Sequence, residues 1–440
     1  MPYTKITEVD NTTVSSISAR ESHAVYIPGF ATLPDFNTYN EPIYLQSISD
    51  LHKLIGNAPY VFDNDMVAHN RSSLDLSYIL AYYLLNAGLP VYYEVPDLSE
   101  QYTLPSVVNN VTMPREEAAM IEWLSDVANL EQLADRSLFP FLGFITSGGY
   151  AASYQNYETG KEGGSTVNII AQNMIQVAER RQDVVALIDH DIDLIKLDKV
   201  FDAINGTNDA DQSARLTSKY AAAFTPWCNL NVKKDWSSAT NKLSDNKIAV
   251  PGSFCYLMAF ATNVNRTQAW LAAAGSMRGT IPFLLEPLAK YGELAINSIA
   301  QKKTGISINT ICNIEPFGYV VWGNRTLNNN IDGLVPSSFL NIRQLISLIR
   351  KQTYLVCRRY TFEQNSDILW LNFRSKIAQM LDSMVVGNGI RAYDIARVAA
   401  PNMATLSARI TIVPIAAVEN FEIEISLSDS ISITESVVNS

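Results

Sequence analysis

Residues 420–437, NFEIEISLSDSISITESV, alternate between apolar and polar side chains along almost their whole length. A period of two is typical of a β-strand that buries one face. The backbone groups of a strand also need partners, so the segment must pair with the edge of a sheet. That edge can belong to its own domain or to another copy of the chain, and the second choice would make the segment a connector between subunits. The apolar side chains are Phe421, Ile423, Ile425, Leu427, Ile431 and Ile433.

The size and charge of the chain indicate how many domains it has and which partners it does not bind. With 440 residues it exceeds the length at which one hydrophobic core usually stops growing, so we expect two domains. The formal net charge of −11 argues against general binding to nucleic acid or to an anionic membrane, because such binding draws on clustered Lys and Arg. Charged residues form 18% of the chain, below the usual quarter, which favours a surface that is largely covered by neighbours.

The cysteines and the N-terminus indicate a protein that folds in the cytosol. The four cysteines are scattered and form no CxxC pair, which predicts buried, reduced thiols and no metal site. Residues 1–13, MPYTKITEVDNTT, lack the pattern of a signal sequence, and the apolar run at residues 78–93 is interrupted by polar and helix-breaking residues. We therefore expect neither export by the usual route nor membrane insertion. The cysteines are Cys228, Cys255, Cys312 and Cys357.

The rest of the chain predicts a mixed α/β (α+β) protein. Residues 1–20 are polar and β-prone, and they are typical of an extended arm that could span about 65 Å. Beyond the arm, apolar runs alternate with segments of helical periodicity, which suggests helices packed on the faces of a central sheet. The expected strands are 24–27, 43–45, 89–95, 139–145, 184–188, 220–224, 306–311, 317–322 and 406–412. The expected helices are 49–56, 74–86, 115–133, 169–181, 253–264, 338–354 and 367–384.

An α/β hydrolase-like enzyme is the first functional class to weigh. Asp189, His190 and Asp191 follow a buried strand, where such folds often place catalytic residues, and Ser165 or Ser253 would be the nucleophile. No GxSxG elbow surrounds either serine, and neighbouring Asp and His side chains point in different directions from a turn. An ordinary polar strand end is favoured, so we expect no catalytic residues.

Phosphate and metal sites are also disfavoured. Gly160 and Lys161 lie in a Gly-rich loop, but a phosphate-binding loop would need Gly at Gln155 and Ser or Thr at Glu162. The histidines lie apart from one another and from the cysteines, so we expect no metal site and no cofactor. The histidines are His23, His52, His69 and His190.

The helix expected from residue 338 carries a basic arc. No acidic residue interrupts this arc before Glu363, although the chain as a whole is acidic. A solvated helix face and a binding face for an acidic partner both explain the arc. Its members are Arg343, Arg350, Lys351, Arg358 and Arg359.

Several runs in the C-terminal half resemble, in content and order, the tail sheath proteins of contractile phages, a family also used in phage-derived contractile injection systems. These runs are VVWGNRTL (Val320–Leu327), SFLNIRQLISLIRKQ (Ser338–Gln352), FEQNSDILW (Phe362–Trp370) and ITIVPIAAVENFEIEI (Ile410–Ile425). The opening arm at residues 3–10 is also similar, and the resemblance covers most of the chain.

The resemblance implies a structural subunit and not an enzyme. Such subunits stack as hexameric rings around an inner tail tube, and contract from a metastable extended state to drive the tube through the host envelope for genome ejection. It implies two domains. Residues 1–20 and 419–440 would be strand arms that complete sheets in neighbouring subunits. Residues 21–300 would form an outer domain, and residues 301–418 the inner domain, which is discontinuous because the arm at residues 1–20 joins it. The sheath of an injection system or bacteriocin is the alternative within the same fold.

The resemblance also implies partners and contact residues. The partners would be other copies of the chain, the inner tube protein, and baseplate and tail terminator proteins, in a virion tail assembled in the host cytoplasm. A helix of the inner domain would touch the tube, with Arg343, Arg350 and Lys351 as candidates. The inter-subunit strand residues would be Ile6, Val9, Ile410, Ile412, Phe421, Ile423, Ile425 and Leu427.

Overall fold

The computed structural model describes most of the chain between residues 21 and 417, and the structural statements below concern these residues alone. The described ranges are 21–29, 39–55, 73–98, 107–108, 111–112, 115–150, 168–192, 194–205, 216–231, 247–281, 283–292, 295–296, 307–328 and 335–417.

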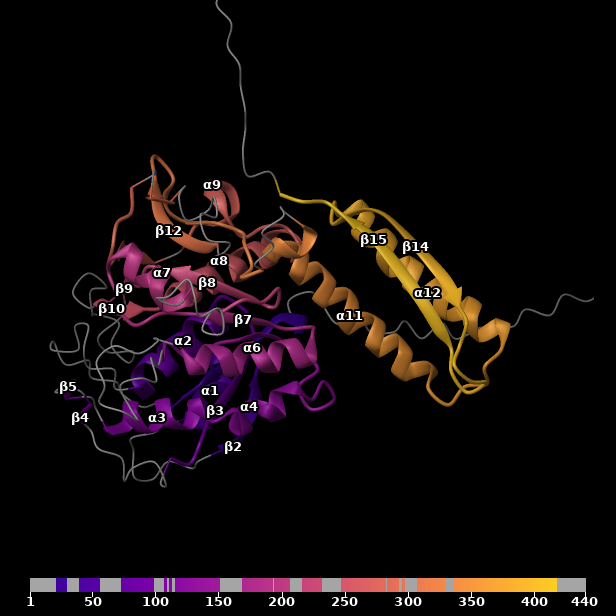
Figure 1. Ribbon diagram of the computed structural model, residues 1–440, viewed down its shortest axis with the longest axis horizontal. Coiled ribbons are helices and arrows are strands. Elements are labelled where there is room, and N and C mark those ends of the chain that lie inside the picture. Colours follow the sequence, from indigo (N-terminus) through magenta and orange to yellow (C-terminus); the bar gives the residue numbers. More distant parts are fainter. Residues whose placement is uncertain are drawn as a thin grey trace, which may run out of the picture.

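An eight-stranded sheet forms the centre of the main body (Figure 1). Its order is β13–β12–β8–β7–β6–β1–β3–β2. The strands from β12 to β3 run parallel, while the edge strands β13 and β2 run antiparallel to their neighbours. The bounds are Ala24–Pro28 (β1), Tyr39–Leu45 (β2), Val91–Val95 (β3), Leu142–Ile145 (β6), Val185–Ile188 (β7), Ala221–Thr225 (β8), Ile308–Ile314 (β12) and Gly318–Trp322 (β13).

Helices cover both faces of this sheet, which explains why its central strands are apolar throughout. Alternate residues of β1 enter two separate cores: Val25 and Ile27 pack on one side, and Ala24 and Tyr26 on the other. The first core includes α2 (Ser73–Asn86) and α8 (Gly252–Arg266), and the second includes α3 (Arg115–Ser125), α6 (Ile169–Arg181) and α7 (Leu197–Asn205).

Smaller elements complete the body. A three-stranded antiparallel sheet has the order β10–β9–β11, and a two-stranded ribbon joins β4 to β5. Their bounds are Val107–Val108 (β4), Val111–Thr112 (β5), Cys228–Asn231 (β9), Lys247–Val250 (β10) and Leu284–Pro287 (β11). The short helices are α1 (Ile48–Ile55), α4 (Val127–Leu130), α9 (Gly275–Arg278) and the 3-10 turns Glu21–His23, Glu131–Ala134 and Pro336–Ser338.

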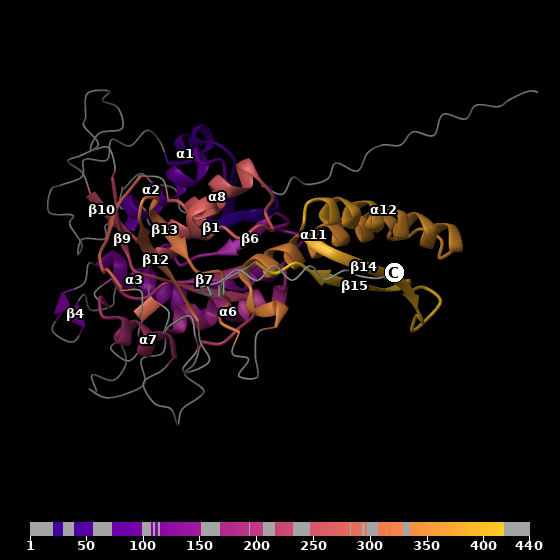
Figure 2. The same cartoon turned by 90° about the horizontal axis from the view of Figure 1, so that it is seen from above.

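A lobe projects from the body at the C-terminal end of the described chain (Figures 1 and 2). It contains the second half of α11 (Leu340–Tyr360), all of α12 (Asp367–Val386) and a hairpin of β14 (Ile390–Val398) and β15 (Ser407–Pro414). These elements share a hydrophobic core of their own, which includes Leu348, Ile377 and Ile395. This core is separate from the two cores of the sheet, and Trp270, from the segment after α8, packs into it and donates a hydrogen bond to Gly387 O.

The structure confirms the expected mixed α/β class. β12 and β13 lie beyond residue 301 and belong to the large sheet, since β12 pairs with β8. The expected division into an outer domain at 21–300 and an inner domain at 301–418 stays a prediction. Residues 1–20 and 419–440, the expected arms, lie outside the described residues.

Candidate assembly surface

α11 connects the body to the lobe. No side chain caps its start at Phe339, but Asn324 and Asn341 exchange two hydrogen bonds there: Asn341 N donates to Asn324 Oδ1 over 3.1 Å, and Asn324 Nδ2 donates to Asn341 Oδ1 over 2.7 Å. Asn341 Nδ2 also donates to the carbonyl of Trp270. The first half of the helix is therefore held in the body, and residues 357–359, near its end, are exposed.

The tip of the lobe is tied together by polar contacts. Ser366 caps α12, because its hydroxyl accepts a hydrogen bond from Leu369 N over 3.2 Å. Asn365 Nδ2 donates to the carbonyl oxygens of Met403 and Thr405 at 2.9 and 3.2 Å. These bonds join the turn between the helices to the turn of the hairpin, so the lobe is closed at its far end.

One face of the hairpin packs on the helices. Tyr393 lies opposite Ile412 and Ile395 opposite Ile410, and all four belong to the core of the lobe. Tyr393 also donates its hydroxyl to Asp382 of α12 over 2.5 Å. The alternation of β15 between half-buried and exposed residues follows from this one-sided cover.

The other face of the hairpin is open. Asp394 lies opposite Thr411, and Ala396 opposite Arg409. Asp394, Thr411 and Arg409 are exposed, and Ala396 is half-buried. Short and charged side chains thus line a flat surface that no described helix covers.

Both edges of the hairpin are free of strand partners within the described chain. β14 and β15 pair only with each other there, so each strand leaves one row of backbone N–H and C=O groups available. An isolated two-stranded ribbon is marginally stable in water, and added strands would satisfy these groups. The free edges make the hairpin the candidate assembly surface.

Two of the eight expected inter-subunit strand residues lie on this surface. Ile410 and Ile412 belong to β15, where they pair with β14 of the same chain and face the helices. The remaining six lie outside the described residues: Ile6, Val9, Phe421, Ile423, Ile425 and Leu427.

Two of the three candidate tube-facing residues are buried within the described subunit. Arg343 and Lys351 are only 3% and 2% exposed, so neither can contact a separate tube from this position. Arg343 lies over the ring of Tyr220, 4.6 Å from its centroid, and Lys351 Nζ donates to the carbonyl oxygen of Ser22. Arg343 and Lys351 are covered because the body packs against the first half of the helix, whereas Arg350, Arg358 and Arg359 of the same arc are exposed.

Burial shifts the protonation equilibria of both groups. It lowers the pKa of Arg343, and it lowers the pKa of Lys351 to about 7. Asp183 partly offsets the shift at Lys351, while Arg181 adds to it. Arg350 remains exposed and donates to Gln182 Oε1 over 2.9 Å. Of the three candidates, Arg350 alone stays accessible.

The residues weighed for hydrolase chemistry form a structural junction instead. Asp189 accepts hydrogen bonds from Ser253 N at 3.0 Å and from Ser253 Oγ at 2.5 Å, which joins the end of β7 to the start of α8. His190 shares a hydrogen bond with the hydroxyl of Thr225 over 2.8 Å. Asp189, His190 and Ser253 are all at most 3% exposed. This is the geometry of a helix cap, and it keeps Ser253 away from solvent.

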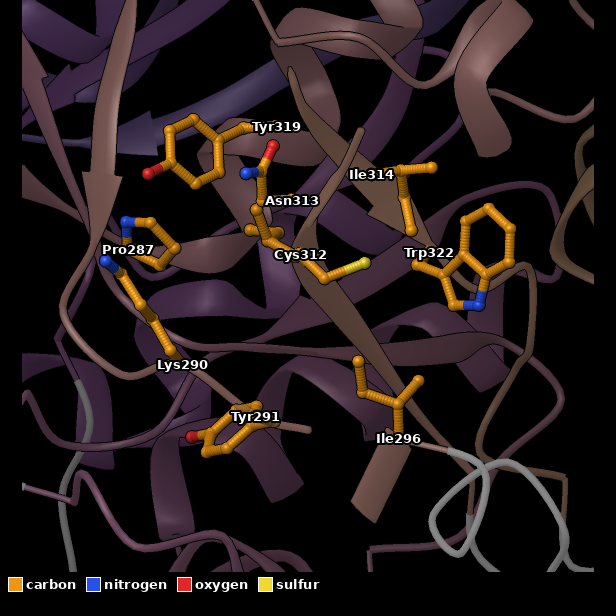
Figure 3. A pocket seen from close by; sticks show the side chains of 10 residues that line it. Pro287, Lys290, Tyr291, Ile296, Cys312, Asn313, Ile314, Tyr319 and Trp322 are labelled. Carbon is orange, nitrogen blue, oxygen red and sulfur yellow. The ribbon is translucent and has the colours of Figure 1, made fainter. Parts of the chain in front are cut away.

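A cavity of about 350 Å³ opens on β12 and β13 (Figure 3). Cys312, Tyr319 and Trp322 line it from the two strands, and Lys290 and Tyr291 from the segment that follows β11. Burial raises the pKa of Cys312 to about 11, so its thiol is protonated at neutral pH and is a weak nucleophile. The cavity walls therefore give no reason to assign nucleophilic catalysis here.

The remaining predictions concern the cysteines, a phosphate or metal site and membrane insertion. Cys228, Cys255 and Cys312 are buried free thiols, whereas Cys357 is exposed, contrary to the expectation that all four would be buried. Ser165, Gly160, Lys161 and His69 lie outside the described residues. Within the described ranges, no cluster of His, Cys, Asp and Glu is suited to hold a metal ion. A search of the same ranges finds no helix with the length and hydropathy needed to cross a membrane.

The sequence interpretation missed β14, the strand that completes the surface. Its charged residues, Arg391, Asp394 and Arg397, recur every three residues, which obscures the period of two. The usable signal was the pair Tyr393 and Ile395, two apolar residues on one strand face.

Solved structures with a similar fold come from contractile machines. A chain of the contracted sheath complex of the extracellular contractile injection system PVC is 16% identical, with 98% of each chain covered and a TM-score of 0.62. A chain of the contracted helical sheath of the anti-feeding prophage (AFP) is 14% identical, with 97% of this chain and 99% of that chain covered and a TM-score of 0.58. A chain of the AFP baseplate is 13% identical over the same shares, with a TM-score of 0.59.

Sequence comparisons add nothing to this likeness, since no family model and no curated protein matches the chain. At these identities the likeness concerns the fold. It extends over nearly the whole of both chains, the body and the lobe included. The chain therefore has the fold of the contractile sheath proteins.

Proposed function

We propose that the protein is a structural subunit of a contractile sheath, which polymerises around an inner tube. The observation that carries this proposal is the hairpin β14–β15, whose two edges have no strand partner within the described chain. The fold shared with sheath chains along the full length supports the same function. Enzymatic activity is not part of the proposal, because the polar residues at the end of β7 are used in a buried helix cap.

Strand addition explains how such a subunit holds its neighbours. The 20-residue N-terminal segment and the alternating segment after residue 419 are both suited to pair with a free edge. A donated strand supplies backbone hydrogen bonds at every second residue, and these can persist while the domains around them rotate. Stacked hexameric rings linked in this way could contract as one body.

The partners follow from this function. They are other copies of the chain along the sheath, the inner tube protein within it, and baseplate and terminator proteins at its ends. The extended state would be metastable, and contraction would form larger contacts between subunits without nucleotide hydrolysis. The division into an inner domain near the tube and an outer domain is part of the proposal, with the lobe in the inner position.

Electron microscopy of the purified full chain tests the proposal. We expect hollow cylinders to form either spontaneously or after addition of the cognate tube protein. A chain that stays monomeric with and without the tube protein would contradict the sheath function.

The same fold fits a phage tail and an injection device or bacteriocin. The solved relatives named above come from injection systems and a prophage-type particle, so the device is a real alternative. Genes for a capsid and a terminase beside the gene of this chain would indicate a phage tail, and a neighbourhood without them would indicate a device.

A further inference from the structure

The cavity on β12 and β13 lies where β12 extends beyond its neighbour β8. β12 pairs with β8 only over Ile308–Thr310, but it pairs with β13 as far as Ile314. The overhanging residues 311–314 line one wall, and residues of the segment after β11 line another (Figure 3). The enclosed space of about 350 Å³ is at the lower end of the range for small-molecule pockets, about 300–1,000 Å³.

Both walls are held in place by backbone hydrogen bonds to other parts of the body. Leu288 N, just before the lining residues of the first segment, donates to Trp227 O over 2.8 Å. On the strand side, Val321 N donates to Gly279 O over 2.8 Å, which braces the outer edge of β13. A small ligand would therefore enter a largely preformed space, and ordering of the walls would cost it little affinity.

The cavity is polar on one side and apolar on the other. Figure 3 shows the amine of Lys290 and the hydroxyl of Tyr319 on one side, and the side chains of Ile296, Ile314 and Trp322 on the opposite side. Trp322 is 42% exposed, so part of its indole ring remains available for stacking. The arrangement suits a ligand that has an apolar ring at one end and a polar group at the other.

The charge of the cavity favours an anion. Lys290 is the only charged residue among the described lining residues, and it forms no ion pair with another described residue. The acidic residues next to the lining in sequence have other partners, because Glu286 pairs with Lys247 at 3.4 Å and Glu315 accepts from Asn313 Nδ2 over 3.0 Å. Lys290 therefore keeps its charge for a ligand.

We propose that this cavity binds one small aromatic carboxylate. The ring of the ligand lies against Trp322 and Cys312, where burial of its apolar surface contributes affinity. Its carboxylate accepts hydrogen bonds from the amine of Lys290 and the hydroxyl of Tyr319. The thiol of Cys312 acts here as part of an apolar wall and forms no covalent bond. The site is independent of the sheath function, and its failure would leave that function untouched.

Isothermal titration calorimetry of the full chain with 2-naphthoate tests the site. We expect one binding site per chain with a Kd of roughly 0.1–1 mM, the range for a ligand of this size. The neutral analogue 2-naphthamide has the same rings without the charge. Lys290→Gln should weaken the binding of 2-naphthoate roughly threefold to tenfold and change that of 2-naphthamide less than about twofold.

Further variants test the location of the site. Lys53→Gln removes an exposed lysine on α1, far from the lining in sequence, and should leave both affinities unchanged. Cys312→Phe places a larger side chain at the wall and should abolish the binding of both compounds, with circular dichroism as the check of folding. If Cys312→Phe does not fold, Trp322→Leu replaces it, and we expect that variant to weaken both compounds by a similar factor.

Three results would overturn the proposal. The first is a wild-type chain that gives neither binding heat nor a rise in melting temperature with 2-naphthoate, since a ligand of the folded state must stabilise it. The second is binding that Lys290→Gln and the wall variant both leave unchanged, which would place the compound elsewhere on the chain. The third is equal affinity of the wild type for 2-naphthoate and 2-naphthamide, which would show that Lys290 does not select an anion.

Discussion

The ammonium group of Lys351 donates a hydrogen bond to the carbonyl oxygen of Ser22, which joins the middle of α11 to the first described residues of the chain. The surroundings include the ion pair of Arg181 with Asp183, in which Nε and Oδ1 are 2.6 Å apart. Lys351 is 2% exposed, and its burial lowers its pKa to about 7. The point where the N-terminal segment leaves the body therefore depends on a buried amine that titrates near neutral pH.

Replacing Lys351 with methionine should remove a pH dependence of stability. Between pH 7 and about 10.5 the folded state holds fewer protons at this amine than the unfolded state, so the free energy of unfolding of the wild type rises with pH. From pH 8 to pH 10 we expect the free energy of unfolding of the wild type to rise by about 1–3 kcal/mol through this amine. Lys351→Met should lack that rise. Urea unfolding of both proteins at several pH values measures it. If the free energies of unfolding of wild type and Lys351→Met changed with pH in the same way, the amine of Lys351 would not be held neutral in the folded state.

Glu94 should produce the opposite slope at lower pH. Its carboxyl group accepts hydrogen bonds from Tyr26 at 2.6 Å and from Gln132 at 2.9 Å, and burial raises its pKa to about 8. Between pH 4.5 and 8 the folded state holds the extra proton, so stability falls as pH rises. We expect Glu94→Gln to flatten this fall by about 1–3 kcal/mol between pH 5 and 8. Thermal melts at matched ionic strength measure the difference, and an equal fall in both proteins would contradict it.

The hydrogen bonds between Ser253 and Asp189 should matter for stability and not for turnover. Ser253→Ala removes the hydroxyl that donates to Asp189 Oδ2, which leaves a buried carboxylate with one donor fewer. We expect the free energy of unfolding to drop by about 1–3 kcal/mol. Ser375→Ala, at an exposed site on α12, is the control and should change it by less than about 0.5 kcal/mol. If Ser253→Ala abolished a hydrolytic activity while leaving stability unchanged, the structural role would be refuted.

The sequence was most informative where a single segment carries its own pattern. The periodicity of residues 338–354 and 367–384 predicted α11 and α12. The buried runs at 184–188 and 220–224 likewise predicted β7 and β8. In each of these segments local propensity and burial favour the same structure.

Features that depend on distant segments were harder to predict. Periodicity correctly placed Arg343 and Lys351 on the polar side of α11, but it cannot reveal that Tyr220 and the carbonyl of Ser22 cover that side. This cover depends on tertiary neighbours, which a periodic pattern within one segment does not encode. β14 was missed for a local reason, since its charged residues at a spacing of three hide the period of two.

Arg350 provides the remaining test of the tube-facing prediction. It is exposed, and its hydrogen bond to Gln182 leaves its charge available to an acidic partner. We expect Arg350→Gln to weaken attachment of the sheath to the tube a few-fold in moderate salt, the scale of one exposed charge pair, while the subunit stays folded. Co-sedimentation with the tube protein measures attachment. The control is Arg374→Gln on α12. Equal attachment of wild type and Arg350→Gln would remove Arg350 from the contact.

Deleting residues 419–440 should separate folding from assembly. The described hairpin ends with Pro414, and Ile415 N still donates to Gly389 O over 3.1 Å, so the truncated chain keeps every strand pair of the described sheets. We expect circular dichroism and melting temperature close to those of the wild type. Polymerisation should be lost, because the free edges of the hairpin then receive no C-terminal strand from a neighbour.

Light scattering and negative-stain microscopy of wild type and deletion, at equal concentration and with tube protein present, measure this loss. A deletion of residues 1–20 serves as a comparison, since it removes the other arm and leaves the C-terminal segment in place. Cylinders of normal length from the chain lacking residues 419–440 would show that the C-terminal segment is not the connector. A truncated chain that fails to fold would mean instead that the segment belongs to the core of its own subunit.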